Sequence, residues 1–284
     1  MKNLLFATLA VAAFTACSKD TTAFDVSPVE ETAVTFHVQG DFTLSTSPMT
    51  RSLEADGKAM TDIWLFDYKD GTLVQSIHQT SSESDFGEPT LTLPYGQHHI
   101  YAVASRGTSA VTDTEAHTIV FGRILDTFWT DHALTVSATT TATATLALDR
   151  VVTKLSFATT DPIPTGTARV DITPHTWYYG LDYLTAQPTD PSEDEPHSIT
   201  IPSDFINTTT TFSIFSFSSA TEWTTPVTVE SYTSTNAVTA TVTIPSAPFK
   251  ANRITQYTGA MWSIGTGLTL TLNADWSSPY NGTW

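Results

Sequence analysis

Short runs in which apolar and polar residues alternate recur along most of the chain. In the first run, Val34, Phe36 and Val38 alternate with polar residues, which predicts a strand with one buried face. Similar runs follow at residues 91–93, 99–104, 134–148, 151–157, 212–217, 227–232, 238–244 and 268–272. Many short strands with turn residues between them are typical of a β-sandwich, so we expect an all-β fold.

One of the runs is apolar at every position. Residues 63–66 read Ile-Trp-Leu-Phe, as expected for a strand that is covered on both faces. The dipeptide Asp70-Gly71 follows, and it favours a tight hairpin turn into the next strand.

Two segments depart from the strand pattern. The spacing i, i+3, i+4, i+7, i+8 predicts one short connecting helix or turn, with its apolar face formed by Phe121, Ile124, Leu125, Phe128 and Trp129. Residues 187–197 are rich in proline and acidic residues, so we expect a solvated loop there.

The order of the predicted strands suggests two domains. A new alternation starts after Asp149-Arg150, and we place a domain boundary there. The expected organisation is a signal peptide at 1–16, a tether at 17–32 and β-sandwich domains at 33–148 and 149–284.

The amino terminus has the features of a lipoprotein signal peptide. Lys2 supplies a positive charge, and Leu4 to Ala16 form an uncharged stretch that, at about 13 residues, is too short to span a membrane. The small residues Thr15 and Ala16 precede Cys17, the only cysteine, as in the lipobox of bacterial lipoproteins. We therefore expect cleavage before Cys17 and lipid attachment to its thiol, which would hold the protein in the outer membrane.

Charge and cysteine content exclude several classes of function. The 284-residue chain carries a formal net charge of −17, which argues against nucleic acid as a partner because phosphate binding needs clustered Lys and Arg. With Cys17 lipidated, no thiol remains for a disulfide or a metal site.

The sequence contains no recognisable catalytic motif, so we expect no enzymatic activity, no cofactor and no metal. His98 and His99 are adjacent and would point to opposite faces of a strand. The acidic group at 190–195 fits a solvated charge run better than a calcium loop. The aromatic residues at 177–179 and Trp262 are compatible with a sugar-binding platform, but packing in a sandwich is the more common use.

Three motifs give the chain a resemblance to a known family. They are MTDIWLFDYKDG at 60–71, LDRVVTKLSF at 148–157 and FKANRITQYTGAMW at 249–262. In this order, and with the lipobox, they resemble the fimbrial subunits of Bacteroidetes, which include fimbrillins and their lipidated anchor proteins.

The resemblance implies two transthyretin-like β-sandwich domains and assembly by donor-strand complementation. In that family an Arg-specific protease removes the first strand, and a strand of a neighbouring subunit replaces it. Arg51 and Ser52 form the candidate cleavage site here, with an ordinary loop arginine as the equal alternative. The donor strand would lie near the carboxyl end, where the residues facing one way are Leu268, Leu270 and Leu272.

We therefore expect a non-enzymatic fimbrial subunit at the bacterial surface, as an anchor or minor component. Its expected partners are other fimbrial subunits, outer-membrane lipid through Cys17 and a host or bacterial surface ligand. The alternative is a surface glycan-binding or adhesin lipoprotein on the same fold.

Overall fold

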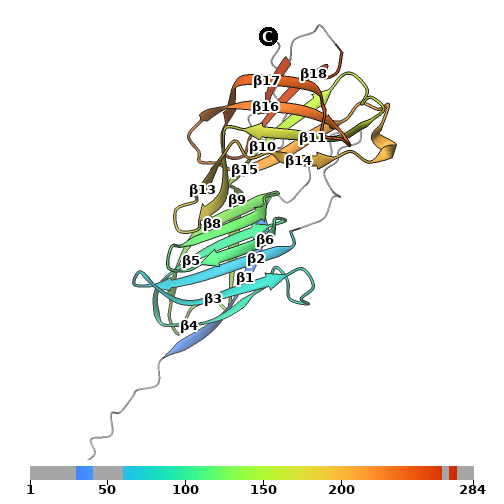
Figure 1. Cartoon of the computed structure of the whole chain (residues 1–284). Helices are drawn as coiled ribbons and strands as arrows, with labels where there is room; N and C mark the ends of the chain where they lie inside the picture. The colour runs from blue at the N-terminus through green and yellow to red at the C-terminus, as the bar shows by residue number, and fades with distance from the viewer. Residues whose placement is uncertain (1–29, 41–59, 264–268, 274–284) are drawn as a thin grey trace, which may run out of the picture.

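The computed structural model describes residues 30–40, 60–263 and 269–273, and these residues form an almost pure β-structure (Figure 1). Within these ranges the only helical element is the short 3-10 turn η1 (Ser203–Phe205). The prediction of an all-β fold with β-sandwiches in tandem is confirmed.

The amino-terminal half contains one sheet of seven strands in the order β3-β2-β5-β8-β9-β1-β4. Its strands are β1 (Glu31–Gly40), β2 (Asp62–Lys69), β3 (Thr72–Thr80), β4 (Thr90–Pro94), β5 (Gly96–Ser105), β8 (Thr127–Val136) and β9 (Thr143–Arg150). Only two residue pairs join β8 to β9, so the sheet divides there into two parts. Both parts contribute apolar side chains to one core.

Strand β2 is buried on both faces, as its continuous apolar run predicted. Ile63 and Leu65 pack in the amino-terminal core, whereas Trp64 and Phe66 pack in a second core at the junction of the two halves. The β2–β3 turn is also as predicted, since Asp70 and Gly71 both have positive φ, 51° and 76°.

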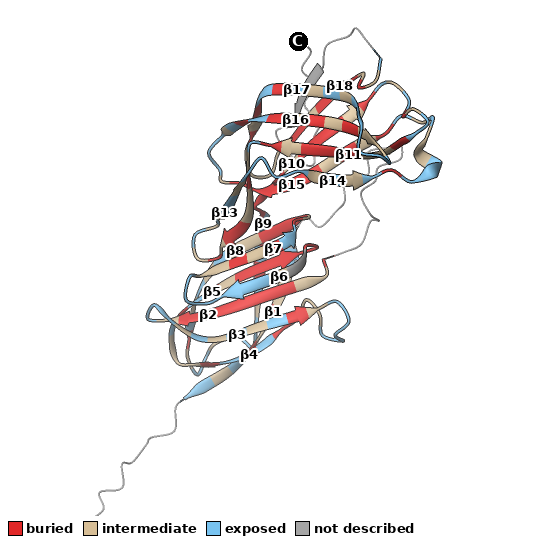
Figure 2. Cartoon of the chain, viewed as in Figure 1, coloured by how far each residue is buried: buried red, intermediate tan, exposed pale blue. Residues whose placement is uncertain are grey.

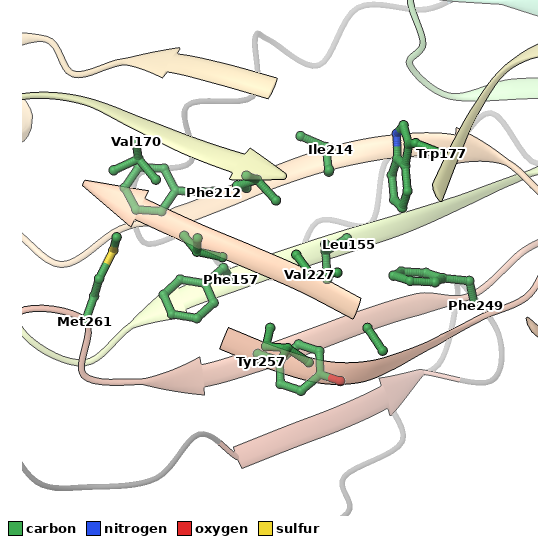
Figure 3. Packing of buried hydrophobic residues seen from close by; sticks show 14 of the residues in the cluster. Leu155, Phe157, Val170, Trp177, Phe212, Ile214, Val227, Phe249, Tyr257 and Met261 are labelled. Atoms are coloured by element: carbon green, nitrogen blue, oxygen red, sulfur yellow. The ribbon is translucent and has the colours of Figure 1, made fainter. Parts of the chain in front are cut away.

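The carboxyl-terminal half is a sandwich of two four-stranded sheets, ordered β15-β10-β18-β19 and β14-β11-β16-β17. The strands are β10 (Val152–Thr159), β11 (Thr167–Pro174), β14 (His197–Thr200), β15 (Thr211–Phe217), β16 (Trp223–Thr233), β17 (Val238–Phe249), β18 (Ile254–Gly259) and β19 (Thr269–Asn273). Figure 3 shows its core, in which Phe157 and Tyr257 lie near Val227 and Trp177 lies near Ile214.

A further sheet joins the two halves. Its order is β13-β12-β7-β6, with β6 (Thr108–Asp113) and β7 (Thr118–Arg123) from the first half and β12 (Thr176–Asp182) and β13 (Gln187–Glu193) from the second. β7 and β12 pair through Val120 with Gly180 and Ile119 with Leu181. Figure 2 shows buried segments in both halves and where the halves meet, so the junction is packed.

The predicted connecting helix at residues 121–129 is wrong. Phe121 lies in β7, Phe128 and Trp129 lie in β8, and Ile124 and Leu125 lie in the connection between them. These residues are apolar because they pack in the cores or against them. Their helical spacing is a coincidence, since it arises from the ends of two strands and the short connection between them.

The predicted loop at residues 187–197 is also wrong, although most of its residues are exposed as expected. Residues 187–193 form β13, which pairs with β12 at the edge of the shared sheet. Pro188 and Pro191 are tolerated because an edge strand has one side without ladder partners.

The signal peptide at 1–16 and most of the tether at 17–32 lie outside the described residues. The domain boundary at 149 stays a prediction.

Candidate functional site: the position of the first strand

Strand β1 occupies a position between two other strands. It runs antiparallel to β4, with Val34 opposite Leu91, and parallel to β9, with Thr35 opposite Thr143. We call this position between β4 and β9 the β1 slot.

The side chains of β1 help to form the amino-terminal core. Val34 and Phe36 are both 0% exposed, as their alternation with polar residues predicted. Burying an apolar side chain of this size contributes about 1.5–3 kcal/mol. Loss of β1 would therefore expose the apolar floor of the slot.

Backbone hydrogen bonds also extend along both sides of β1. The N–H of Thr35 donates to Ala142 O at 2.8 Å on the β9 side. The N–H of Phe36 donates to Pro89 O at 2.9 Å, just before β4. An empty slot would leave unpaired N–H and C=O groups on two facing strand edges, which is what an incoming strand can satisfy.

Strand β4 has anchors of its own, apart from β1. His98 Nε2 donates to Pro94 O at 2.7 Å, and Lys69 Nζ donates to Tyr95 O at 2.7 Å. Gln75 Nε2 donates to Thr92 O at 3.0 Å. Because these three donors come from β5, β2 and β3, the far wall of the slot is tied to the rest of the sandwich.

The ring of His98 also contacts a buried carboxyl group. His98 Nδ1 and Asp67 Oδ1 are hydrogen-bonded at 2.6 Å, and both side chains are 0% exposed. Both ring nitrogens of His98 are therefore in hydrogen bonds, one to Asp67 and the other to Pro94 O, which fixes the orientation of the ring. The adjacent His99 is exposed and pairs with Asp131, so the two histidines do point to opposite faces. The sequence contained no signal for the partnership with Asp67, which depends on the pairing of β2 with β5.

The carboxyl-terminal candidates lie at the other sandwich. β19 pairs with β18, and it places Leu270 opposite Tyr257 and Leu272 opposite Thr255. β19 is an edge strand of its sheet. Leu268 lies outside the described residues, as do Cys17, Arg51 and Ser52, so the structure does not place these four.

The segment that leads toward β19 is held by one carboxylate. Asp161 accepts hydrogen bonds from the backbone N–H groups of Met261, Trp262 and Ser263 at 2.9, 2.7 and 2.7 Å. Partial burial acts to raise the pKa of Asp161, but these hydrogen bonds outweigh it and lower the pKa below the ordinary value.

The other candidate residues are dispersed. Trp177 is buried, and its indole N–H donates to Phe215 O at 2.8 Å, so it belongs to the core and not to an exposed platform. Trp262 is half-buried and donates to Ser231 Oγ at 3.0 Å. Among the described residues, no group of three or more His, Cys, Asp or Glu side chains is placed to hold a metal ion. No helix in this part of the chain is long and apolar enough to cross a membrane.

An architecture of consecutive β-sandwiches is also found in several solved structures. A candidate adhesin from Bacteroides thetaiotaomicron is similar in structure, with a TM-score of 0.51, 11% identity and coverage of 90% of this chain and 100% of that chain. The tip fimbrial protein Mfa3 from Porphyromonas gingivalis gives a TM-score of 0.46 at 11% identity, covering 86% of this chain and 99% of that chain. A fimbrial assembly protein from Parabacteroides distasonis gives 0.42 at 11% identity, covering 86% and 95%.

No family model matches the sequence, and no curated protein matches it. The likeness to solved structures therefore shows the fold.

Proposed function

We propose that this protein is a non-enzymatic fimbrial subunit of the bacterial surface, an anchor or minor component, which assembles by donor-strand complementation. Its partners are other fimbrial subunits, and lipid on Cys17 attaches it to the outer membrane. The observation that carries the proposal is the β1 slot, where one strand supplies Val34 and Phe36 to the core and is bordered by a strand on each side.

The order of the chain makes β1 separable from the rest of the sandwich. Residues 41–59, which include Arg51, connect β1 to β2. A cut after Arg51 would leave β1 held by non-covalent contacts alone. The anchors on Pro94, Tyr95 and Thr92 would then keep β4 in place while the slot exchanges strands.

The two ends of the molecule support assembly between copies. β1 lies in the lower half in Figure 1, whereas β18 lies at the top of the other half. Since β19 pairs with β18, a carboxyl-terminal strand is far from the slot of its own chain. It is better placed to enter the slot of another subunit, which produces a head-to-tail contact.

The mature amino terminus separates an anchor from a polymerising subunit. Mass spectrometry of protein taken from the cell surface should give a lipidated Cys17 for an anchor. A start at Ser52 would instead support a cleaved, polymerising subunit. A non-lipidated start at any other residue would contradict both forms of the proposal.

The donor strand is tested by deletion of residues 268–284. The deletion should abolish assembly and spare export, with surface protein measured by immunoblot and fimbriae by electron microscopy. A matched variant with Val238→Ser, an exposed residue in β17, should assemble normally. Normal fimbriae from the deletion would refute the role of this segment as donor.

A further inference from the structure

A cleft of about 480 Å³ lies at the junction of the two halves. We call it the junction cleft, and its polar and aromatic lining includes Arg123, Tyr179, Glu195, His197, Ser198 and Ser213. A second hollow of about 380 Å³ adjoins it and shares Gly122, Tyr179 and Glu195. Each volume is in the range of ordinary small-ligand sites.

The walls of the cleft come from both halves of the chain. Arg123 ends β7, which belongs to the first half, whereas Tyr179 lies in β12 of the second half. Ser198 lies in β14 and Ser213 in β15, the edge strands of the two sheets of the carboxyl-terminal sandwich. The pairing of β7 with β12 fixes these walls relative to one another.

Two aromatic rings form a stacked pair in the cleft. Tyr179 and His197 have ring centroids 5.7 Å apart and planes inclined by 15°, and the tyrosine hydroxyl lies 3.3 Å from His197 Nε2. Burial lowers the pKa of His197 to about 4, against the opposing effect of Glu195. Burial, followed by the charge and hydrogen bond of Glu195, raises the pKa of Tyr179 to about 12. Both rings are therefore uncharged at neutral pH.

The charged groups beside the rings have opposite signs. The Arg123 guanidinium is exposed and has no hydrogen-bond or ion-pair partner among the residues that the structure describes. Glu195 accepts a hydrogen bond from Ser192 Oγ at 2.7 Å, which orients its carboxylate. Asp190 borders the adjoining hollow.

This set of groups discriminates between ligand classes. Two carboxylates, Glu195 and Asp190, outnumber the one guanidinium of Arg123, so an anion is disfavoured, and an apolar ligand would leave these polar groups unpaired. Donors and acceptors placed around an aromatic surface match a ligand with many hydroxyl groups and no charge.

We propose that the junction cleft binds a neutral saccharide. Tyr179 supplies the aromatic surface, Arg123 donates to sugar oxygens, and Glu195 accepts from sugar hydroxyls. This property is independent of strand exchange at the β1 slot, because the two places share no residue and lie on different strands.

The test begins with the intact mature protein on an array of neutral and acidic oligosaccharides. Isothermal titration then measures the Kd for the neutral oligosaccharide that is retained. Arg123→Ala and Glu195→Ala should each weaken binding about tenfold, because each removes a hydrogen-bonding charged group. Both side chains are exposed, so the thermal unfolding midpoint should not change.

Glu115→Ala and Lys250→Ala are the matched controls, since neither residue lines the cleft. Both should bind the oligosaccharide as the parent protein does. The proposal would be overturned if the array retained only acidic oligosaccharides or none at all. It would also be overturned if the cleft variants and the control variants changed the Kd equally. The proposal would also be overturned if a peptide of residues 268–284, and no saccharide, shifted the amide resonances of Tyr179 and Ser198, because the occupant of the cleft would then be a peptide. Arg123→Ala and Glu195→Ala should still assemble into fimbriae, so the two proposals fail separately.

Discussion

At the scale of single residues, the β1 slot depends on a few fully buried side chains. Val34 and Phe36 connect β1 to the core, and the His98–Asp67 pair connects β4 to the opposite part of the sheet. The buried contacts of Val34 and Phe36 hold β1 in the slot. The hydrogen bonds of His98 hold β4, the far wall of the slot, in position.

Replacing Phe36 by alanine should destabilise the protein by about 3–5 kcal/mol, because the large side chain leaves a cavity in a packed core. The measurement is urea unfolding followed by tryptophan fluorescence. Thr35→Ala is the control, since Thr35 is only half-buried and makes an exposed hydrogen bond with Thr90. An equal loss of stability in the two variants would contradict the assigned core position.

Replacing His98 by alanine should destabilise the protein by about 1–3 kcal/mol for each of its two buried hydrogen bonds, since Asp67 Oδ1 and Pro94 O lose their partner. His99→Ala is a matched control on the adjacent residue, whose side chain is 52% exposed. It should change the unfolding free energy by less than about 1 kcal/mol, as expected for an exposed ion pair. If His98→Ala were as stable as His99→Ala, the anchor on β4 would have to lie elsewhere.

At the scale of elements, the position of the chain before β19 depends on Asp161. Its carboxylate accepts from three consecutive backbone N–H groups of residues 261–263.

The lowered pKa of Asp161 makes this contact pH-dependent. A carboxyl group whose pKa is lowered by folding stabilises the fold above its unfolded value of 3.8, and the stabilisation is lost as the pH falls through the lower, folded pKa. The amide resonances of Met261, Trp262 and Ser263 should therefore titrate with a midpoint below 3.8. In Asp161→Asn this titration should be absent. A midpoint above 3.8 in the parent protein would contradict the role of the hydrogen bonds.

At the scale of the whole molecule, the two halves share a sheet and a core. Tyr183 stacks on Phe66 with ring centroids 3.8 Å apart, and its hydroxyl lies 3.0 Å from that of Tyr68. The indole N–H of Trp129 donates to Tyr183 O at 2.7 Å. Arg150 supplies another tie, because it donates from Nε and Nη2 to the Asp126 carboxylate of the first half and from Nη1 to Asn252 Oδ1 of the second half at 3.1 Å.

We expect the intact protein to unfold in a single calorimetric transition, because neither half can unfold without exposing the junction core. Tyr183→Ala should reduce stability by about 3–5 kcal/mol and separate the transition into two. Tyr232→Ala, on β16 and outside the junction core, should preserve one transition. Two transitions in the parent protein would show that the halves are energetically independent.

Much of the fold could be predicted because a strand buried on one face leaves a period of two in its sequence. β1 and the opposite directions of His98 and His99 follow from that rule, whereas β2 follows from its continuous apolar run and the β2–β3 turn from its Asp70-Gly71 dipeptide. The rule fails at residues 121–129, where apolar residues from two strand ends and their connection fall at helical spacing. It fails again in β13, where the pairing with β12 outweighs two prolines and two acidic residues.

The sequence by itself determined the class of fold, the buried face of β1 and the candidate positions Cys17, Arg51, Ser52, Leu268, Leu270 and Leu272. These are local properties, because each depends only on adjacent residues or on a fixed spacing between residues. The tertiary structure decided which strands border β1, that Asp67 is the partner of His98, and that β7 pairs with β12 to create the junction cleft. Those contacts join residues far apart in the chain, and no local pattern specifies which distant strand edge will satisfy a given row of backbone N–H and C=O groups.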